Sequence, residues 1–273
     1  MLKQAHLILL LSVVAAASAA CSSDANLPLS DIRCTDSGGA QSVTKINYWA
    51  EGVIDTIELS GGQDVSKLDF YYSGDTVSEI RVPGSGAKLL FDYNSNDQMD
   101  FVSLTGAEEP IQTVISYNSD NFVDSFSTSM GGESQALIGT FEYSDEKLSS
   151  IRRGGSVQDF RWDGDNLTRL YRGASSVSFE YSDDVLSVVD TGTSRTRVSY
   201  EDDRIYETVT TSTSGGSVVR CTYFYADSDE DVRGMRMTPS IPFGVHFTME
   251  GRPWSEPSLL DLHFTWLNTM WDD

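Results

Sequence analysis

The side chains best suited to acid–base catalysis lie near the C-terminal end of the chain. His246 and His263 are the two histidines that follow the N-terminal twenty residues, and Glu250 lies between them. These three groups could serve a hydrolase as general acid and base. Both histidines also stand among apolar residues, which is typical of histidines packed in a core. No Ser/His/Asp order, His-x-x-x-His or Cys-x-x-Cys accompanies them, so no reaction class is favoured.

A group of carboxylates is a second candidate site, in this case for binding a divalent cation. Asp227, Asp229 and Asp231 alternate along the chain, as the first calcium ligands of an EF-hand loop do. Val232 and Thr238 occupy the positions at which that loop needs glycine and glutamate. A solvated acidic turn without a metal is therefore the preferred interpretation, and calcium is the alternative.

A repeated segment in the middle of the chain predicts the secondary structure that would position such groups. Residues 141–148, 160–167, 179–186 and 198–205 share one pattern, and their central aromatics Tyr143, Trp162, Tyr181 and Tyr200 are 19 residues apart. Such a fixed period indicates a repeat architecture. Looser copies centre on Tyr72, Tyr93 and Tyr117, with degenerate end copies at 46–53 and 223–227.

Each copy predicts a β-hairpin. The Phe-x-Tyr alternation is the period-two pattern of a half-buried strand, and the Asp/Ser cluster after it is typical of a tight turn. An aliphatic residue five positions after the aromatic begins the second strand. Another apolar residue follows three positions later, such as Val189 after Leu186, which requires either a β-bulge or partial burial of both sheet faces. Paired carboxylates such as Asp183-Asp184 recur in the turns and therefore indicate architecture, whereas a glycosidase pair is singular.

The unit aromatic-x-Tyr-x-x-Asp-x-Leu resembles the YD repeat of Rhs-type proteins and of bacterial lipoprotein families built from such repeats. The resemblance covers residues 46 to 230. The family usually follows its Tyr-Asp pair with glycine and a basic residue, whereas this chain is rich in serine and aspartate there. No toxin domain and no protease-type core motif accompanies the repeats, so the resemblance implies a fold and no activity.

The fold class expected from these patterns is all-β. Tandem YD-like hairpins over 41–235 should form one continuous, twisted or curled antiparallel sheet of about fourteen strands. Repeat aromatics should form its core and line one face: Tyr72, Tyr93, Tyr117, Phe141, Tyr143, Phe160, Trp162, Phe179, Tyr181 and Tyr200. Residues 236–273, rich in proline and tryptophan, are predicted to form a small C-terminal cap.

The N-terminus is predicted to be a bacterial lipoprotein signal. Residues 1–20 have a cationic start, an apolar stretch too short to span a membrane, and small residues directly before Cys21. We expect Cys21 to be lipidated, with ordinary cleavage after a small-x-small site as the alternative. Residues 21–40 are predicted to be a flexible tether. Ser22 favours the outer membrane, by resemblance to lipoprotein sorting signals.

Two cysteines remain after Cys21. Cys34 and Cys221 flank the repeats and form an even pair in an oxidising compartment. A flat sheet of about fourteen strands, at about 4.8 Å each, would hold its ends some 65 Å apart. A disulfide would therefore require the sheet to curl round, and two free thiols are the alternative.

The net charge is -22, from 41 acidic and 19 basic residues. This balance argues against nucleic acid and against an anionic lipid surface as partners. Two function classes remain open. The preferred one is a non-enzymatic binding or scaffold module, held at the cell envelope by its lipid anchor, whose repeated surface and exposed tyrosines would bind a polysaccharide or a surface protein. The alternative is an envelope hydrolase with a site around His246, Glu250 and His263.

Overall fold

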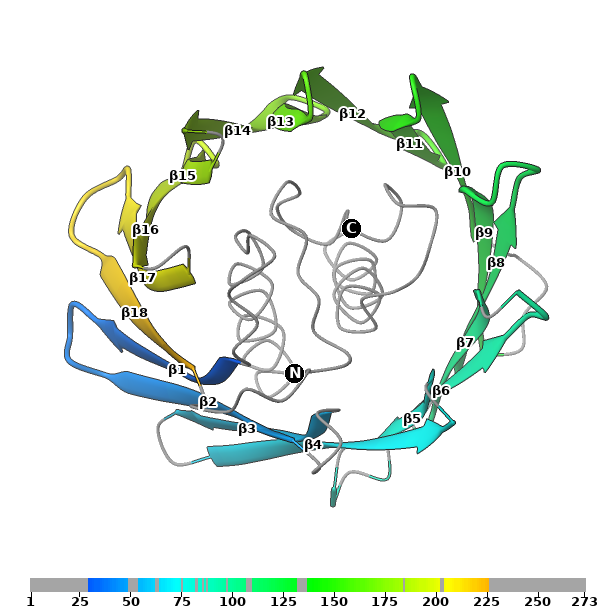
Figure 1. Ribbon diagram of the computed structural model, residues 1–273, viewed down its shortest axis with the longest axis horizontal. Helices are drawn as coiled ribbons and strands as arrows, with labels where there is room; N and C mark the ends of the chain where they lie inside the picture. The colour runs from blue at the N-terminus through cyan, green and yellow to red at the C-terminus, as the bar shows by residue number, and fades with distance from the viewer. Residues whose placement is uncertain are drawn as a thin grey trace.

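The computed structural model describes residues 29–225 except 49–53, 62–63, 75, 82, 85, 87, 97, 107–109, 132–136, 184 and 202–203. This part of the chain consists of β-strands joined by turns (Figure 1). The strands are β1 Leu29–Asp36, β2 Gln41–Tyr48, β3 Ile54–Gly61, β4 Asp64–Ser73, β5 Thr76–Arg81, β6 Lys88–Tyr93, β7 Met99–Thr105, β8 Ile111–Tyr117, β9 Val123–Met130, β10 Leu137–Ser144, β11 Lys147–Arg153, β12 Ser156–Asp163, β13 Asn166–Arg172, β14 Ser175–Ser182, β15 Val185–Asp190, β16 Ser194–Glu201, β17 Arg204–Ser212 and β18 Val218–Tyr225. No helix in these ranges is long and apolar enough to cross a membrane.

The strands form one closed antiparallel barrel. Each strand pairs with the next along the chain, and β18 pairs with β1 to complete the ring seen in Figure 1. The all-β, antiparallel prediction is confirmed. The prediction of about fourteen strands in a sheet that need not close is wrong, because the described residues contain eighteen strands and the sheet has no free edge.

A β-bulge in every repeat unit accounts for the curvature and for the odd apolar spacing. In the unit formed by β14 and β15, Phe179 lies opposite Val189 and Tyr181 opposite Leu186, so that Ser187 is the extra residue. The same register shift occurs in the eight other units. A bulge bends its strand and raises the local twist. Of the two explanations for the spacing, the bulge is therefore correct.

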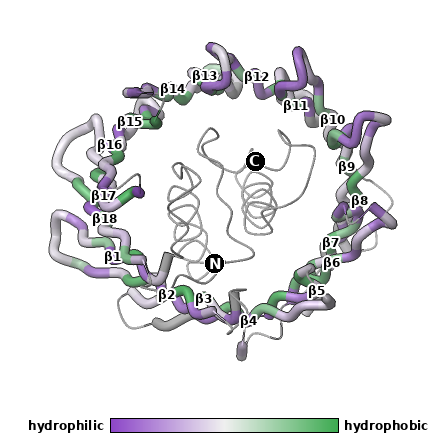
Figure 2. The backbone as a smooth tube through the Cα atoms, viewed as in Figure 1, coloured by the Kyte–Doolittle hydropathy of each residue, from purple (hydrophilic) through white to green (hydrophobic). Residues whose placement is uncertain are grey.

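The bulges keep the aromatic and aliphatic side chains of each unit on one face of the wall, here called the apolar face. Leu148, Leu167 and Met99 are completely buried there. The predicted common face is confirmed, since the apolar cluster contains Phe141, Tyr143, Phe160, Trp162, Phe179 and Tyr181. Figure 2 shows hydrophobic and hydrophilic residues alternating along strands around the whole ring. The other face, here called the polar face, carries the charged and hydroxyl side chains.

The ninth unit is built from both ends of the described chain. Tyr225 of β18 lies opposite Leu29 of β1, and Ser30 is the extra residue of its bulge. Residues 29–33 (Leu-Ser-Asp-Ile-Arg) match residues 77–81 of the second unit (Val-Ser-Glu-Ile-Arg). The tether predicted for 21–40 is therefore wrong from residue 29 onward, because β1 is the second strand of a hairpin whose first strand is β18.

A disulfide joins the two strands of this composite unit. Cys34 and Cys221 lie directly opposite each other in the β1–β18 register and are bonded. The bond links residues 187 positions apart. In the chain-entropy model, a cross-link that closes so long a loop stabilises the folded state by about 5 kcal/mol. The closing pair of strands is thus held covalently as well as by its backbone hydrogen bonds.

The alternating strand directions give the ring two different rims. One rim, here called the terminal rim, carries the turns that follow the repeat aromatics and also the positions where β1 begins and β18 ends. Asp145, Glu146 and Asp183 adopt positive φ angles in these turns, as a tight hairpin turn requires. Aspartate therefore acts there as a turn residue. The predicted signal 1–20, Cys21 and the predicted cap 236–273 lie outside the described residues.

One close approach in the wall generates a stability prediction. Gly139 of β10 faces Phe126 of β9, and a Cβ atom at Gly139 would lie 1.7 Å from Cε1 of the Phe126 ring. Phe126 is buried against Phe141, so its ring has little room to move. Gly139→Ala should lower the free energy of unfolding by about 1–3 kcal/mol, as overpacking does.

Urea denaturation with an unchanged slope would measure this loss. The matched control is Gly155→Ala, because no heavy atom lies within 4 Å of a Cβ at that exposed turn position. Equal stabilities for the two variants would contradict the packing described for Gly139.

Candidate binding surface

The repeat aromatics hold adjacent units together and are not a free binding surface. Seven of them donate a side-chain hydrogen bond to the carbonyl oxygen of a buried apolar residue in the preceding unit, at 2.6 to 3.0 Å. The donor–acceptor pairs are Tyr93–Val77, Tyr117–Met99, Tyr143–Val123, Trp162–Leu148, Tyr181–Leu167, Tyr200–Leu186 and Tyr225–Ile205. The side-chain donors of these seven residues are therefore engaged within the wall.

Burial also changes the titration of these phenols. Burial raises the pKa of Tyr181 to about 12 and is the main cause of the shift. The pKa of Tyr223 is likewise raised to about 12, by burial. Burial raises the pKa of Tyr117, Tyr143 and Tyr200 as well. The phenols are thus neutral donors over the whole physiological range.

The extra residue of each bulge makes a second recurring contact. Where it is serine or threonine, its hydroxyl donates to the carbonyl oxygen of the residue before the repeat aromatic. The pairs are Ser30–Phe224, Ser78–Tyr71, Ser149–Glu142, Thr168–Arg161 and Ser187–Glu180, at 2.9 to 3.2 Å. These bonds satisfy backbone acceptors beside the bulge and so fix the local register.

Because the register is fixed, polar-face residues on successive strands line up in rows. One charged row crosses seven strands from β12 to β18: Arg161, Arg169, Ser178, Asp190, Arg195, Thr211 and Val218. We call these seven residues the arginine row. Neighbouring strands lie about 4.8 Å apart, so the row extends over about 29 Å.

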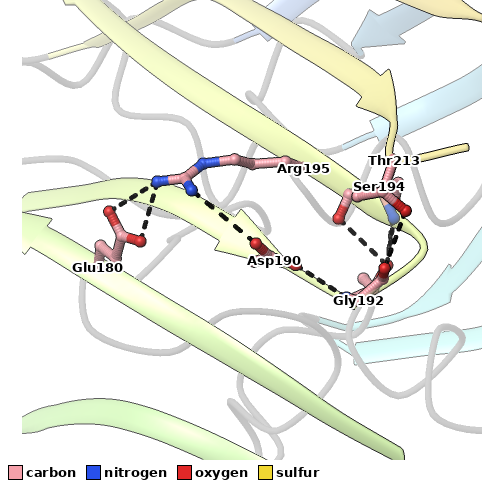
Figure 3. A network of polar contacts seen from close by, with 7 residues as sticks. Glu180, Asp190, Gly192, Ser194, Arg195 and Thr213 are labelled. Atoms are coloured by element: carbon pink, nitrogen blue, oxygen red, sulfur yellow. Dashed lines mark hydrogen bonds and ion pairs between the residues drawn. The ribbon is translucent and has the colours of Figure 1, made fainter. Parts of the chain in front are cut away.

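Arg195 is held at the centre of a polar network within the arginine row (Figure 3). It donates to both carboxylate oxygens of Glu180, at 2.9 and 3.1 Å, and lies 3.9 Å from Asp190. Asp190 accepts a bond from the Gly192 amide, and the Thr213 hydroxyl donates to the Gly192 carbonyl oxygen. The network therefore connects strands β14, β15 and β16 with the turn between β17 and β18, and it restrains the Arg195 guanidinium.

Other polar-face charges are also paired. Arg152 donates to Glu142 at 2.8 Å, and this contact lowers the pKa of the Glu142 carboxyl. Arg220 pairs with Glu207. These ion pairs are exposed, so each contributes little to stability.

Two exposed aromatics of the polar face lie directly before a repeat aromatic, and the exposed Tyr206 is instead the extra residue of a bulge. Tyr71 is 40% exposed and lies under the Arg81 guanidinium, which is 4.3 Å from its ring centroid. Phe224 is 38% exposed and contacts Arg33 at the same distance. The middle residue of the Phe-x-Tyr triplet is the sequence signal for this set, since alternation places it on the face opposite the core.

The other predicted site residues cannot be located in the ring. His246, Glu250, His263 and the calcium candidates Asp227, Asp229 and Asp231 lie outside the described residues. Within residues 29–225, as far as they are described, no group of three or more His, Cys, Asp or Glu side chains could hold a metal ion.

No protein-family model and no curated protein matches the chain. Solved structures that resemble it include a porin-like protein from Bacteroides uniformis, with 8% identity, a TM-score of 0.44, and coverage of 74% of this chain and 99% of that one. A porin-like protein from Bacteroides vulgatus has 11% identity, a TM-score of 0.42, and coverage of 74% and 100%. A crystal structure of TcdB2-TccC3 without its hypervariable C-terminal region has 11% identity and a TM-score of 0.37.

The match to TcdB2-TccC3 covers 71% of this chain and only 13% of that chain. Repeat-like β-structure is the extent of the likeness to these proteins. TM-scores below 0.5 do not carry family or activity, so a function for this chain rests on the contacts of the ring itself.

The raised phenol pKa values predict a loss of stability in alkali. A group whose pKa is raised by folding keeps its full contribution below its unfolded value, about 10 for tyrosine, and loses it as the pH rises through the folded value. The free energy of unfolding should therefore fall between pH 10 and pH 12, from the values for Tyr181 and Tyr223. Urea unfolding combined with phenolate absorbance would measure both changes. Complete phenolate formation near pH 10 in a ring that stays folded would contradict the assignment.

Proposed function

We propose that this protein is a non-enzymatic binding or scaffold module that presents its polar face to an extended partner. The observation that carries the proposal is the arginine row, in which seven side chains line up across β12 to β18. A stretched polysaccharide or a protein segment could contact such a row at intervals of about 4.8 Å.

The construction of the wall supports this function. The apolar face and the aromatic hydrogen bonds hold the ring together, so polar-face residues can vary without loss of the fold. Arg195 is restrained by Glu180 and Asp190, which reduces the entropy lost when it contacts a partner. Repeat arrays commonly present extended surfaces of this kind.

We further propose that the ring is anchored to a bacterial outer membrane by lipid on Cys21. Seven residues lie between Cys21 and Leu29 at the start of β1, so the chain spans at most about 28 Å there. Because β1 begins and β18 ends on the terminal rim, that rim would face the lipid surface. The wall and the arginine row would then stand away from the membrane.

Binding of the purified protein to arrays of glycans and of envelope surface proteins tests the function. We expect at least one partner whose affinity falls as salt rises, since the row is charged. Failure to bind on every array, together with turnover of a cell-wall substrate that His263→Ala abolishes, would establish the envelope hydrolase instead.

The anchor has its own test. Cys21→Ala or globomycin should leave unprocessed precursor and abolish labelling by palmitate, because lipoprotein processing requires the acylated cysteine. Fractionation of the cell envelope would show where the processed form resides. Normal processing without incorporated palmitate would refute lipidation and leave the binding proposal intact.

A further inference from the structure

We propose that Arg161 and Arg169 form a site for the carboxylate groups of an acidic polysaccharide. The inference rests on the proposed function and names the class of partner. Arg161 of β12 and Arg169 of β13 lie directly opposite each other in the hairpin register. Both side chains are exposed on the polar face.

Two like charges in this position oppose folding. Cross-strand neighbours have Cβ atoms about 5 Å apart, and like charges placed so are destabilising. Five other arginines of the polar face have a carboxylate partner, namely Arg33, Arg81, Arg152, Arg195 and Arg220. Arg197 of β16 is exposed and has no ion pair with a described residue. Neither Arg161 nor Arg169 has an ion pair with any described residue.

The sequence places carboxylates nearby that could have neutralised Arg161. Asp159 and Asp163 are two residues away along the same strand, on the same face. Elsewhere in the ring this spacing does produce ion pairs, as between Arg33 and Asp31 at 2.7 Å. The arrangement around Arg161 therefore leaves its guanidinium available for an external carboxylate.

Arg169 is positioned by contacts on its own strand. Its Nη1 donates to the Tyr171 hydroxyl at 3.2 Å, and this hydrogen bond raises the pKa of the guanidinium. Across the hairpin, the Thr168 hydroxyl bonds the carbonyl oxygen of Arg161 and holds the bulge that follows it. Both arginines are thus set on a locally fixed backbone, beside an aromatic ring.

The surroundings suit a sugar chain. Ser178 lies opposite Arg169 and Ser176 opposite Tyr171 on β14, so hydroxyl groups flank the guanidinium groups on one side. Guanidinium groups bind carboxylates through two parallel hydrogen bonds, and serine hydroxyls exchange hydrogen bonds with sugar hydroxyls. The partner that matches both is a polymer carrying carboxylates and hydroxyls.

The charge of the protein argues against two other anionic partners, nucleic acid and lipid headgroups. Nucleic acid binding requires a basic surface patch, which two arginines do not supply in a chain of net charge -22. For lipid headgroups, the terminal rim would approach the membrane first, and its turns carry Asp145, Glu146, Asp165 and Asp183. Those carboxylates repel an anionic surface.

Binding of polygalacturonate, a carboxylated polysaccharide, to the purified protein tests the proposal. The double variant Arg161→Gln/Arg169→Gln should weaken binding by about tenfold or more, since charge-assisted hydrogen bonds are lost. Its midpoint of urea denaturation should be unchanged or higher, because a like-charge contact is removed. The matched control is Arg220→Gln, which removes charge from an arginine already paired with Glu207, and binding should be retained.

Three further probes test whether the site prefers a carboxylated polysaccharide to a neutral polysaccharide, free phosphate or an anionic lipid surface. Dextran, which is neutral, should not bind, and inorganic phosphate or phosphatidylglycerol vesicles should bind far more weakly than polygalacturonate. Stronger binding of the vesicles, no binding of polygalacturonate, or equal binding by the double variant and the Arg220→Gln control would overturn the inference. In each of these cases a partner found on the arrays would still support the proposed function.

Discussion

The pairing of β18 with β1 is the contact on which the rest of this structure depends. Without it, eight hairpins would form an open sheet whose edge strands expose unpaired backbone groups, which invites association with other chains. Leu29 and Ser30 complete the unit that Tyr225 begins, with the same bulge as in the other units and the same hydroxyl–carbonyl bond as in four of them. The disulfide between Cys34 and Cys221 then makes this closure covalent. Closure is what turns a repeat array into a barrel.

Adjacent units are coupled by one type of hydrogen bond. A long aromatic side chain donates to a buried carbonyl oxygen of the preceding unit, which would otherwise lack this partner in an apolar setting. Trp162 occupies one of these positions because its indole N–H can donate as the tyrosine hydroxyls do. The requirement is therefore for an aromatic ring with a polar donor at its far end, and this explains why phenylalanine does not occur at the repeat aromatic.

The two faces of the wall have different roles. The apolar face stabilises the ring, and the polar face is available for recognition. The apolar face, the bulges and the disulfide maintain the ring, so the polar face can tolerate arrangements that are unfavourable by themselves. The opposed Arg161 and Arg169 are such an arrangement, and functional sites commonly retain local features that reduce stability. The paired Arg195, by contrast, shows how the same wall neutralises an arginine where neighbouring carboxylates reach it.

The hairpins, their turns and the face on which Phe179 and Tyr181 lie follow from the residues alone, because alternation and turn chemistry are local properties. The 19-residue period also indicated the repeat architecture. Closure was decided only by the tertiary structure, since Cys34 meets Cys221 across 187 positions and no local pattern specifies that distance. The arginine row was decided there too, because each bulge shifts the register by one residue and so determines which side chains become neighbours. Local chemistry thus specifies the unit, whereas long-range pairing specifies the ring and its surface.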